Sequence, residues 1–278
     1  MQSTTEPDPE FGALLTERGP AWGPRLAVFG VIAIFAVIIG GVALAQGEAV
    51  IALAVAGVAL ALMALTQALL SKVRLRIFEH GIERRGPLGT KRLAWSNFER
   101  YQLQIVDSTA AAAGGAGGVL GALLVRAIVK AVSKNDELLP TSVTLHGRDR
   151  QRLILSSSIA EYKPLVKTLI PSLTERLFPH ARQAYEGGSE LSFGKKLTLQ
   201  RGVGLTFTGL LGKKYVLPLE QAASATLERT TLVIRRSDSN APWQTINASS
   251  LHNVGVLQRF IETTGKPYDE RLPMAWTS

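Results

Sequence analysis

Two long uncharged runs near the N-terminus, separated by only three residues, constrain this chain more than any other feature. The first run covers Leu26 to Ala45, and the second covers Ala49 to Leu70. At about 1.5 Å rise per residue, a helix of either run is long enough to cross a bilayer core of about 30 Å. The connection Gln46–Glu48 is so short that the helices must run antiparallel. We therefore expect a transmembrane hairpin over residues 26–71, with both of its ends on one side of the membrane.

Charged residues around these runs predict which side that is. Arg18 and Arg25 precede the first run, Lys72 and Arg74 follow the second, and the connection carries only Glu48. Basic residues flanking membrane helices favour the cytoplasmic side. Both termini and the bulk of the chain are therefore expected to be cytoplasmic.

A cleaved signal peptide is the alternative interpretation of the first run, because Ala43-Leu44-Ala45 resembles a cleavage site. A signal peptide begins with a positively charged region. Residues 1–25 instead contain four acidic residues and two arginines. The sequence therefore favours the uncleaved hairpin.

Composition and charge exclude several classes of protein. The chain of 278 residues has no cysteine, which excludes disulfide scaffolds, cysteine-ligated zinc and thiol catalysis. Its formal net charge of +9 is unevenly spread: residues 1–71 carry −3, residues 72–180 carry +8, and residues 181–278 carry +4. The basic excess thus lies in the part of the chain that directly follows the hairpin.

The chain beyond Ser71 contains an internal repeat. Short alternating runs and turn signals predict strands, and each series of strands is followed by an amphipathic helix. The corresponding segments are 75–100 and 197–221, then 142–158 and 231–250, then the helices 159–177 and 252–263. We expect a polar tail at 1–25, a first domain at 72–180, a linker at 181–194, a second domain at 195–265 and a C-terminal tail at 266–278.

Several apolar residues of the repeat are expected to form the cores of the two domains. In the first, Trp95 and Phe98 are interpreted as core residues, and in the second Leu217 and Leu219 take that part. Leucines recur every four residues along the first helix and predict its buried stripe. These leucines are Leu165, Leu169, Leu173 and Leu177.

One stretch of the first domain resembles a known group of proteins. The hairpin is followed by Phe78-Glu79-His80-Gly81-Ile82, the basic pair Arg84-Arg85, and Trp95 before the next strand. This layout resembles bacterial membrane proteins that carry pleckstrin-homology-like (PH-like) domains, including a family without a known function. The resemblance extends over residues 26–180 and, less closely, over 195–264.

The resemblance implies a fold and a location. The fold class is a membrane-anchored α+β protein, in which a two-helix transmembrane hairpin precedes two tandem PH-like β-barrels, each capped by a C-terminal helix. The location is the bacterial inner membrane. The shared motifs are structural turns, so no catalytic chemistry follows from them.

A Gly/Ala-rich insertion at 108–136 interrupts the first domain and has no counterpart in the second. Gly114, Gly118, Arg126 and Lys130 are spaced by multiples of four and share one face of a predicted helix. Such a helix suits a membrane interface, where basic side chains reach towards lipid headgroups. Packing against the barrel and oligomerisation through Gly114-x-x-x-Gly118 are the two alternatives. The small residues of the hairpin offer the same choice between packing the hairpin against itself and assembly of several copies.

A basic surface next to the bilayer is the candidate binding site. Anionic lipid attracts each basic side chain near the membrane surface by about 1 kcal/mol. The candidate residues are Arg74, Arg76, Arg84, Arg85, Lys91, Arg92, Arg126 and Lys130. The alternative is that these residues reflect the positive-inside bias alone.

Two further ligand classes are not expected. Phosphoinositide-binding PH domains carry basic residues around the loop between their first two strands, and we assign that loop to Glu79–Gly81, which is short and lacks a basic cluster. Nucleic acid is not expected either, because no basic strand interleaved with aromatic residues and no recognition helix is present.

No enzyme, cofactor or metal signature is found in the sequence. The four histidines are far apart and lack metal-ligand spacing. The sequence therefore predicts a non-enzymatic membrane protein without cofactors, which presents PH-like domains for binding of a protein or of anionic lipid. The alternative function is a homo-oligomeric structural subunit, assembled through the hairpin and the Gly-rich insertion.

Overall fold

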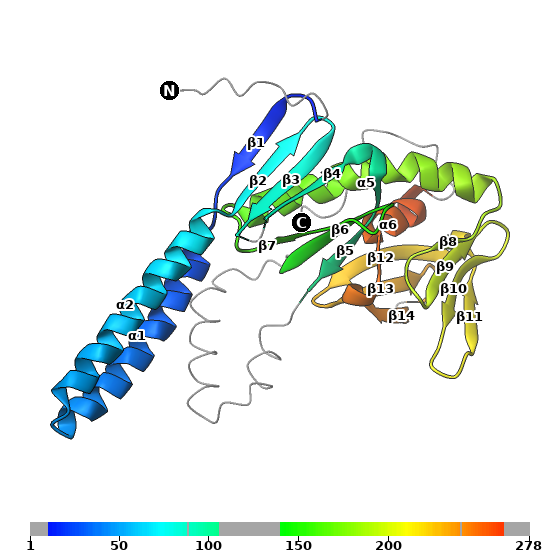
Figure 1. The fold of residues 1–278 in the computed structure, drawn as a ribbon. Helices are drawn as coiled ribbons and strands as arrows, with labels where there is room; N and C mark the ends of the chain where they lie inside the picture. Colours follow the sequence, from blue (N-terminus) through cyan, green and yellow to red (C-terminus); the bar gives the residue numbers. More distant parts are fainter. Residues whose placement is uncertain (1–10, 88, 106–139, 240, 264–278) are drawn as a thin grey trace.

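The computed structural model describes residues 11–87, 89–105, 140–239 and 241–263. It shows a mixed α+β protein with an elongated helical hairpin attached to a body of antiparallel sheets (Figure 1). The predicted insertion at 108–136 and the C-terminal tail lie outside the described residues.

The two uncharged runs form the predicted helical hairpin. Helix α1 covers Trp22–Ala45 and helix α2 covers Ala49–Ser71. Both contain a segment long and apolar enough to cross a membrane, and only 6% of each segment is buried. The helices contact each other and project away from the body, unlike core helices of a soluble domain (Figure 1).

Only some of the small residues of the hairpin lie in the contact between α1 and α2. Ala43 and Ala59 are buried, and a Cβ atom placed on Gly40 would lie 4.0 Å from the carbonyl oxygen of Ala52. In contrast, a Cβ atom placed on Gly30, Gly41 or Gly57 would meet nothing within 4 Å. The hairpin contact thus accounts for Gly40 and leaves these three glycines on open faces of the helices.

The first unit of the body consists of a four-stranded sheet, a three-stranded sheet and a long helix. The strands are β1 (Leu14–Arg18), β2 (Arg74–Phe78), β3 (Gly81–Gly86) and β4 (Gly89–Ala94), then β5 (Phe98–Gln104), β6 (Ser142–Gly147) and β7 (Arg152–Ser156). Helix α5 follows at Tyr162–Glu186. All neighbouring strands are antiparallel.

Strand β1 lies before the hairpin, in the segment that sequence analysis assigned to a polar tail. It pairs with β2, which follows the hairpin, and the register places Arg18 opposite Leu75. The chain between β1 and α1 is tied to the body as well: the amide of Ala21 donates to the carbonyl of Ser158, and the amide of Ala160 donates to the carbonyl of Gly19, both at 2.8 Å. The helical hairpin is therefore the connection between the first two strands of the sheet. Assigning that connection to Glu79–Gly81 was wrong, because this turn joins β2 to β3.

The second unit repeats the element order of the first. Its strands are β8 (Leu191–Ser192), β9 (Leu197–Gln200), β10 (Gly204–Thr208) and β11 (Lys214–Leu217), then β12 (Ala222–Glu228), β13 (Thr231–Arg236) and β14 (Pro242–Asn247). Helix α6 follows at Val254–Thr263. Short 3-10 helices, Trp95–Asn97 and Leu219–Gln221, join the two sheets in each unit, and a third covers Ala248–Ser250.

The predicted closed barrels are not seen in the described part of the chain. Its strands form four separate sheets, with four, four, three and three strands. In each unit the two sheets face a common core. The two sheets of a unit are held together by side-chain packing, and not by the backbone hydrogen bonds that would close a barrel.

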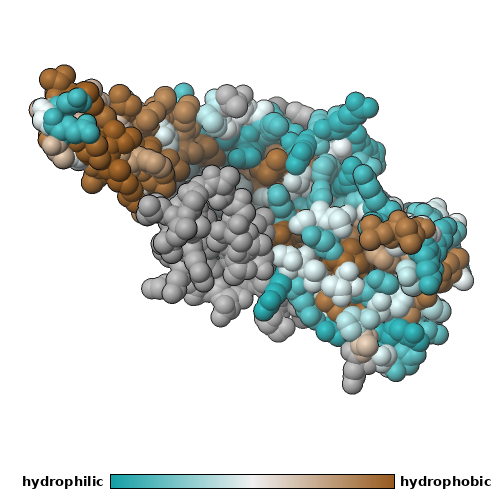
Figure 2. Space-filling view, turned by 90° about the horizontal axis from the view of Figure 1, so that it is seen from below, coloured by the Kyte–Doolittle hydropathy of each residue, from teal (hydrophilic) through white to brown (hydrophobic). Residues whose placement is uncertain are grey.

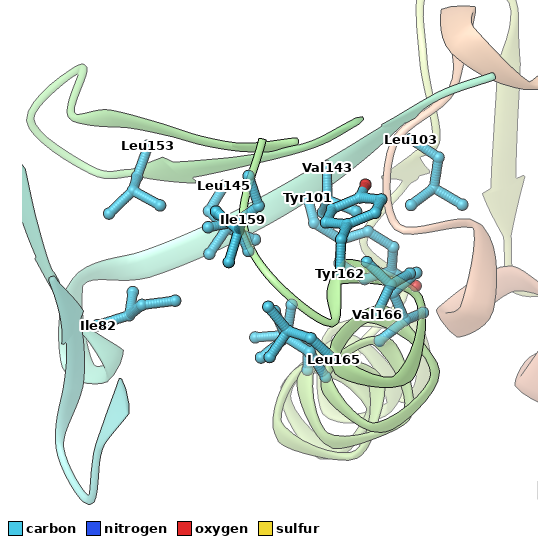
Figure 3. Packing of buried hydrophobic residues seen from close by; sticks show 14 of the residues in the cluster. Ile82, Tyr101, Leu103, Val143, Leu145, Leu153, Ile159, Tyr162, Leu165 and Val166 are labelled. Atoms are coloured by element: carbon cyan, nitrogen blue, oxygen red, sulfur yellow. The ribbon is translucent and has the colours of Figure 1, made fainter. Parts of the chain in front are cut away.

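The predicted apolar residues occupy these cores. In the first unit Leu165, Leu169 and Leu173 of α5 are buried against Leu145 and other sheet residues (Figure 3). Phe98 is buried, and Leu217 and Leu219 are buried in the second unit. Trp95 is partly buried on the first core and donates its Nε1 hydrogen to the carbonyl of Phe78 at 3.3 Å.

Helix α5 belongs to both cores. Its first half packs in the first unit, whereas Phe178 and Tyr185 pack against Phe260 of α6 with ring centroids 5.1 and 5.3 Å apart. The helix continues to Glu186, so the first part of the expected linker at 181–194 is helical and contributes to the second core. The two units therefore share one rigid element.

Tyr101 of β5 is the polar joint between the units. Its side chain is fully buried, and its hydroxyl lies 2.9 Å from Thr174 Oγ1 of α5 and accepts a hydrogen bond from the amide of Gly255 at 2.8 Å. The amide of Tyr101 also donates to Asn253 Oδ1 at 2.9 Å. Burial raises the pKa of Tyr101 to about 12, so the hydroxyl is neutral and all its polar contacts persist at physiological pH.

The joint leaves no room for a side chain at Gly255, which yields a first prediction. A Cβ atom there would lie 2.4 Å from Thr174 Oγ1 and 2.6 Å from the Tyr101 hydroxyl. Overpacking of this kind costs about 1–3 kcal/mol. Gly255→Ala is therefore expected to lower the apparent melting temperature of the full-length protein in detergent, as measured by circular dichroism.

Gly19→Ala is the matched control, since a Cβ atom at Gly19 would meet nothing within 4 Å. It should leave the melting temperature unchanged. Equal melting temperatures for Gly255→Ala and Gly19→Ala would contradict the tight joint.

Candidate membrane-surface site

The hairpin meets the body at a group of aromatic and basic side chains. Trp22 begins α1 and is 65% exposed, and the guanidinium of Arg25 lies 5.2 Å from the centre of its ring. Arg25 is itself buried and donates to Gln67 Oε1 of α2 at 3.4 Å. Aromatic and basic residues at the ends of apolar helices are typical of the boundary between bilayer and water.

Three of the predicted binding residues lie on the outer face of the first sheet. Leu75, Ile82 and Leu93 point into the core, so the alternating residues of the same strands point outwards. These outward residues include Arg74 and Arg76 of β2 and Arg92 of β4.

Two carboxylates on the same face pair with these three arginines and leave a net positive charge. The strand register aligns Glu17, Arg76, Glu83 and Arg92 in one row across β1 to β4, which we name the charge ladder. Arg76 Nε lies 3.2 Å from Glu17 Oε2, and Arg92 Nε lies 2.7 Å from Glu83 Oε2. Arg74 Nη1 adds a contact of 2.8 Å to Glu17 Oε1.

The arginines of this face affect the pKa of Glu17, and burial sets Glu83 apart from the exposed charges. The hydrogen bond from Arg74, together with the charge of Arg76, lowers the pKa of Glu17, so this carboxylate stays ionised at neutral pH. Glu83 is only 3% exposed, whereas its partner Arg92 is about half exposed, so the carboxylate is the buried member of this ion pair. The charge ladder therefore acts first as a cross-strand stabiliser of the sheet.

Arg84 does not join the surface formed by the other arginines. It points to the inner side of the sheet, where its Nη1 donates to the carbonyl of Ile154 in β7 at 2.6 Å. Burial lowers the pKa of this guanidinium. Arg84 thus links the two sheets of the first unit.

Arg85 and Lys91 are exposed and lie at the end of the sheet where the hairpin enters. Arg85 is directly opposite Arg74 in the β2–β3 register, whereas Lys91 is opposite Arg84 in the β3–β4 register and so extends from the other face of the sheet. Lys72, just after α2, is exposed as well. We name Lys72, Arg74, Arg85 and Lys91 the basal cluster. Arg74 and Arg85 are like charges in directly opposite positions and repel, so this end of the sheet favours a nearby anion.

The remaining predicted site residues, Arg126, Lys130, Gly114 and Gly118, lie outside the described residues. Of the predicted residues that are described, the structure places Arg74, Arg85 and Lys91 at the hairpin end of the first sheet, with Lys91 on the other face, and assigns Arg76 and Arg92 to the charge ladder.

Sequence reasoning missed the two carboxylates of the ladder. Glu83 alternates with Arg85 along one strand, so a paired acid on the basic face was readable from the strand period. Glu17 offered no such signal, because its strand forms only against β2.

The histidines and acids of the described segments form no metal centre. No group of three or more side chains able to hold a metal ion occurs among them. Partial burial, and then the charge of Arg100, lower the pKa values of His146 and His252, so both are neutral at physiological pH.

The charge ladder yields a second prediction. Glu83→Gln keeps the shape of the side chain but leaves Arg76 and Arg92 without their shared anion. Loss of a buried charged partner costs about 1–3 kcal/mol in stability. We expect a lower midpoint of chemical denaturation for the full-length protein.

Glu228→Gln is the control, because Glu228 pairs with Arg235 at 2.7 Å on the exposed surface. Exposed pairs of this kind contribute about 0–1 kcal/mol. A Glu83→Gln effect no larger than that of Glu228→Gln would refute the stabilising role of the ladder.

Comparisons with known proteins connect part of this chain to one family. Searches of curated proteins and of solved structures found no match. Residues 134–269 match the model described as "Family of unknown function (DUF6585)". The matched segment includes β6 and β7 of the first unit, the shared helix α5 and the whole second unit.

Proposed function

We propose that this chain is a non-enzymatic protein of the bacterial inner membrane, in which a two-pass helical anchor holds two PH-like units against the cytoplasmic surface. The first unit binds anionic lipid headgroups through the basal cluster. The observation that carries the proposal is the apolar hairpin, exposed along its whole length, with basic residues at the end that joins the body.

The exposure of the apolar side chains of the hairpin supports its insertion into a membrane. Its helices have 24 and 23 residues, and most of their large apolar side chains are exposed. Figure 2 shows them as a continuous hydrophobic surface that ends where the body begins. A contiguous apolar surface of this size is unfavourable in water, and a bilayer removes that cost.

Charge distribution supports a cytoplasmic body. Arg18, Arg25 and the basal cluster lie at the body end, whereas the far turn carries only Glu48. Basic residues favour the cytoplasmic side. Both termini then share the cytoplasm with the two units.

The order of elements supports PH-like units. In each unit antiparallel strands form two sheets around one core, and a C-terminal helix packs against that core. This is the order that the resemblance of the sequence implies, although the sheets do not close into a barrel. No catalytic constellation is needed for such a unit, whose known use is binding.

The basal cluster supports lipid as the ligand. Its four basic side chains are exposed around the base of an anchor, within reach of headgroups. Each basic residue near an anionic surface contributes about 1 kcal/mol of attraction. A partner protein that binds the rest of the surface is the alternative ligand under the same proposed binding function.

The open glycines of the hairpin favour a second candidate, a homo-oligomeric structural subunit. Gly30, Gly41 and Gly57 have free space above their Cα atoms. Small residues on lipid-facing helices permit close contact between copies. A stable oligomer in native mass spectrometry of the detergent-solubilised protein, lost on Gly41→Leu and Gly57→Leu, would favour this candidate, and a monomer would count against it.

The topology yields the third prediction. Because the chain has no cysteine, single-cysteine variants report one position each. We expect Glu48→Cys to react with a membrane-impermeant maleimide from outside intact spheroplasts. Ser189→Cys, after the end of α5, should react only in inside-out vesicles.

Two results would overturn this topology. Labelling of both positions from the same side would exclude the hairpin orientation. Release of the protein from membranes by alkaline carbonate would exclude integral insertion.

A further inference from the structure

The turn between β10 and β11 presents two leucines almost wholly to solvent. Leu210 is 93% exposed and Leu211 is 98% exposed. The turn is well defined: the amide of Gly209 donates to the carbonyl of Lys213 at 2.8 Å, and the amide of Gly212 donates to the carbonyl of Gly209 at 3.1 Å. Leu210 and Leu211, which we name the leucine turn, are thus held at the apex by the backbone.

Four lysines surround the leucine turn. Lys213 and Lys214 follow it directly, and Lys195 and Lys196 lie beside it because the carbonyl of Lys196 accepts a hydrogen bond from the amide of Thr208 at 2.8 Å. All four are exposed, and none forms an ion pair with any residue that the structure describes. We name them the lysine cluster.

The surrounding sheet contains no acid to balance these charges. From Leu191 to Leu219 the sequence has no Asp or Glu, and it has Arg201 in addition to the lysine cluster. In the first unit, by contrast, Glu17 and Glu83 pair with three of the basic residues on the sheet, Arg74, Arg76 and Arg92. The end of the second sheet is therefore a strongly positive surface with an aliphatic apex.

This combination fits the boundary of an anionic bilayer. Aliphatic side chains enter the acyl region, while lysines reach the headgroups above them. Tyr215, whose ring lies 5.3 Å from Lys213 Nζ, adds an amphipathic side chain next to the apex.

The repeat places the leucine turn at the end that faces the membrane in the first unit. The β8–β9 turn, with Lys195 and Lys196, corresponds to the connection between β1 and β2, which is the helical hairpin itself. The β10–β11 turn corresponds to the β3–β4 turn beside the basal cluster. The β3–β4 turn and the β10–β11 turn both lie on the lower side of the body in Figure 1. Figure 2 shows the molecule from that side, and a hydrophobic patch separate from the hairpin is visible on the second unit.

We propose that the leucine turn and the lysine cluster form a second membrane contact, which inserts into the interface of the anionic bilayer that holds the hairpin. This inference rests on the proposed membrane anchor and extends it to the second unit. The protein then touches the bilayer at two separated places, and its second unit lies on the membrane surface.

Depth-dependent fluorescence quenching tests the contact, and it yields the fourth prediction. The Leu210→Cys variant of the full chain carries an NBD fluorophore and is reconstituted into vesicles of equimolar phosphatidylcholine and phosphatidylglycerol. We expect blue-shifted emission that is quenched when part of the lipid carries a nitroxide near the headgroup end of its acyl chain. NBD on Ser189→Cys should show neither effect.

A charge reversal distinguishes a local role of the lysine cluster from attraction of the lipid by the overall positive charge of the second sheet. Lys213→Glu in the labelled chain should reduce the quenching at position 210. Arg201→Glu makes the same change of charge at the other end of the same sheet, in the turn between β9 and β10. It should leave the quenching unchanged, and equal losses for both variants would overturn the role of the lysine cluster.

A label on Val37→Cys, in α1, separates failure of this inference from failure of the anchor. It is read with lipid that carries its nitroxide near the end of the acyl chain, because position 37 lies about 16 Å along the helix from Leu26, close to the middle of the bilayer. Quenching at position 37 together with unshifted, unquenched emission at position 210 would overturn the second contact and leave the anchor intact. Absence of quenching at position 37 would overturn both. A blue shift at position 210 without lipid quenching would show that protein covers the leucine turn, which would overturn the lipid assignment.

Discussion

Backbone pairing of β1 with β2 across the helical hairpin is the constraint on which the arrangement of this protein depends. The hairpin leaves the sheet through β1 and returns to it through β2, and the segment before α1 is also bonded to the chain before α5. A membrane helix joined to a domain by one flexible segment lets the domain swing freely. Two bonded connections instead fix the angle between hairpin and body, so in the proposed topology each surface of the body keeps one height above the bilayer.

The shared helix α5 extends this rigidity to the second unit. Tyr101 and Thr174 bring both units to one buried polar joint, and Phe178 and Tyr185 continue the helix into the second core. These contacts connect the hairpin, the first unit and the second unit without a loose linker between them. In the proposed topology, the fixed position of the second unit therefore decides whether its leucine turn meets the bilayer. On a mobile linker the turn would have no fixed position.

Much of this architecture was predictable from the sequence, and the exceptions have a common cause. The hairpin, the repeated strand order and the leucine stripe of α5 arise from local patterns of apolar residues, which the sequence displays directly. Strand β1 is five residues long and exists because β2 offers a partner far along the chain. The same distance hid Glu17 as the partner of Arg74 and Arg76, so the basic surface predicted from residue counts was larger than the one that remains unpaired.

The position of β1 also has a consequence for how the protein is made. A ribosome completes β1 before the hairpin and β2 after it, so the first sheet stays without its edge strand until both helices have been synthesised. Domains generally fold as units during synthesis. In the proposed topology the sheet is completed only after the hairpin has been synthesised and inserted, which makes insertion a step in the folding of the body.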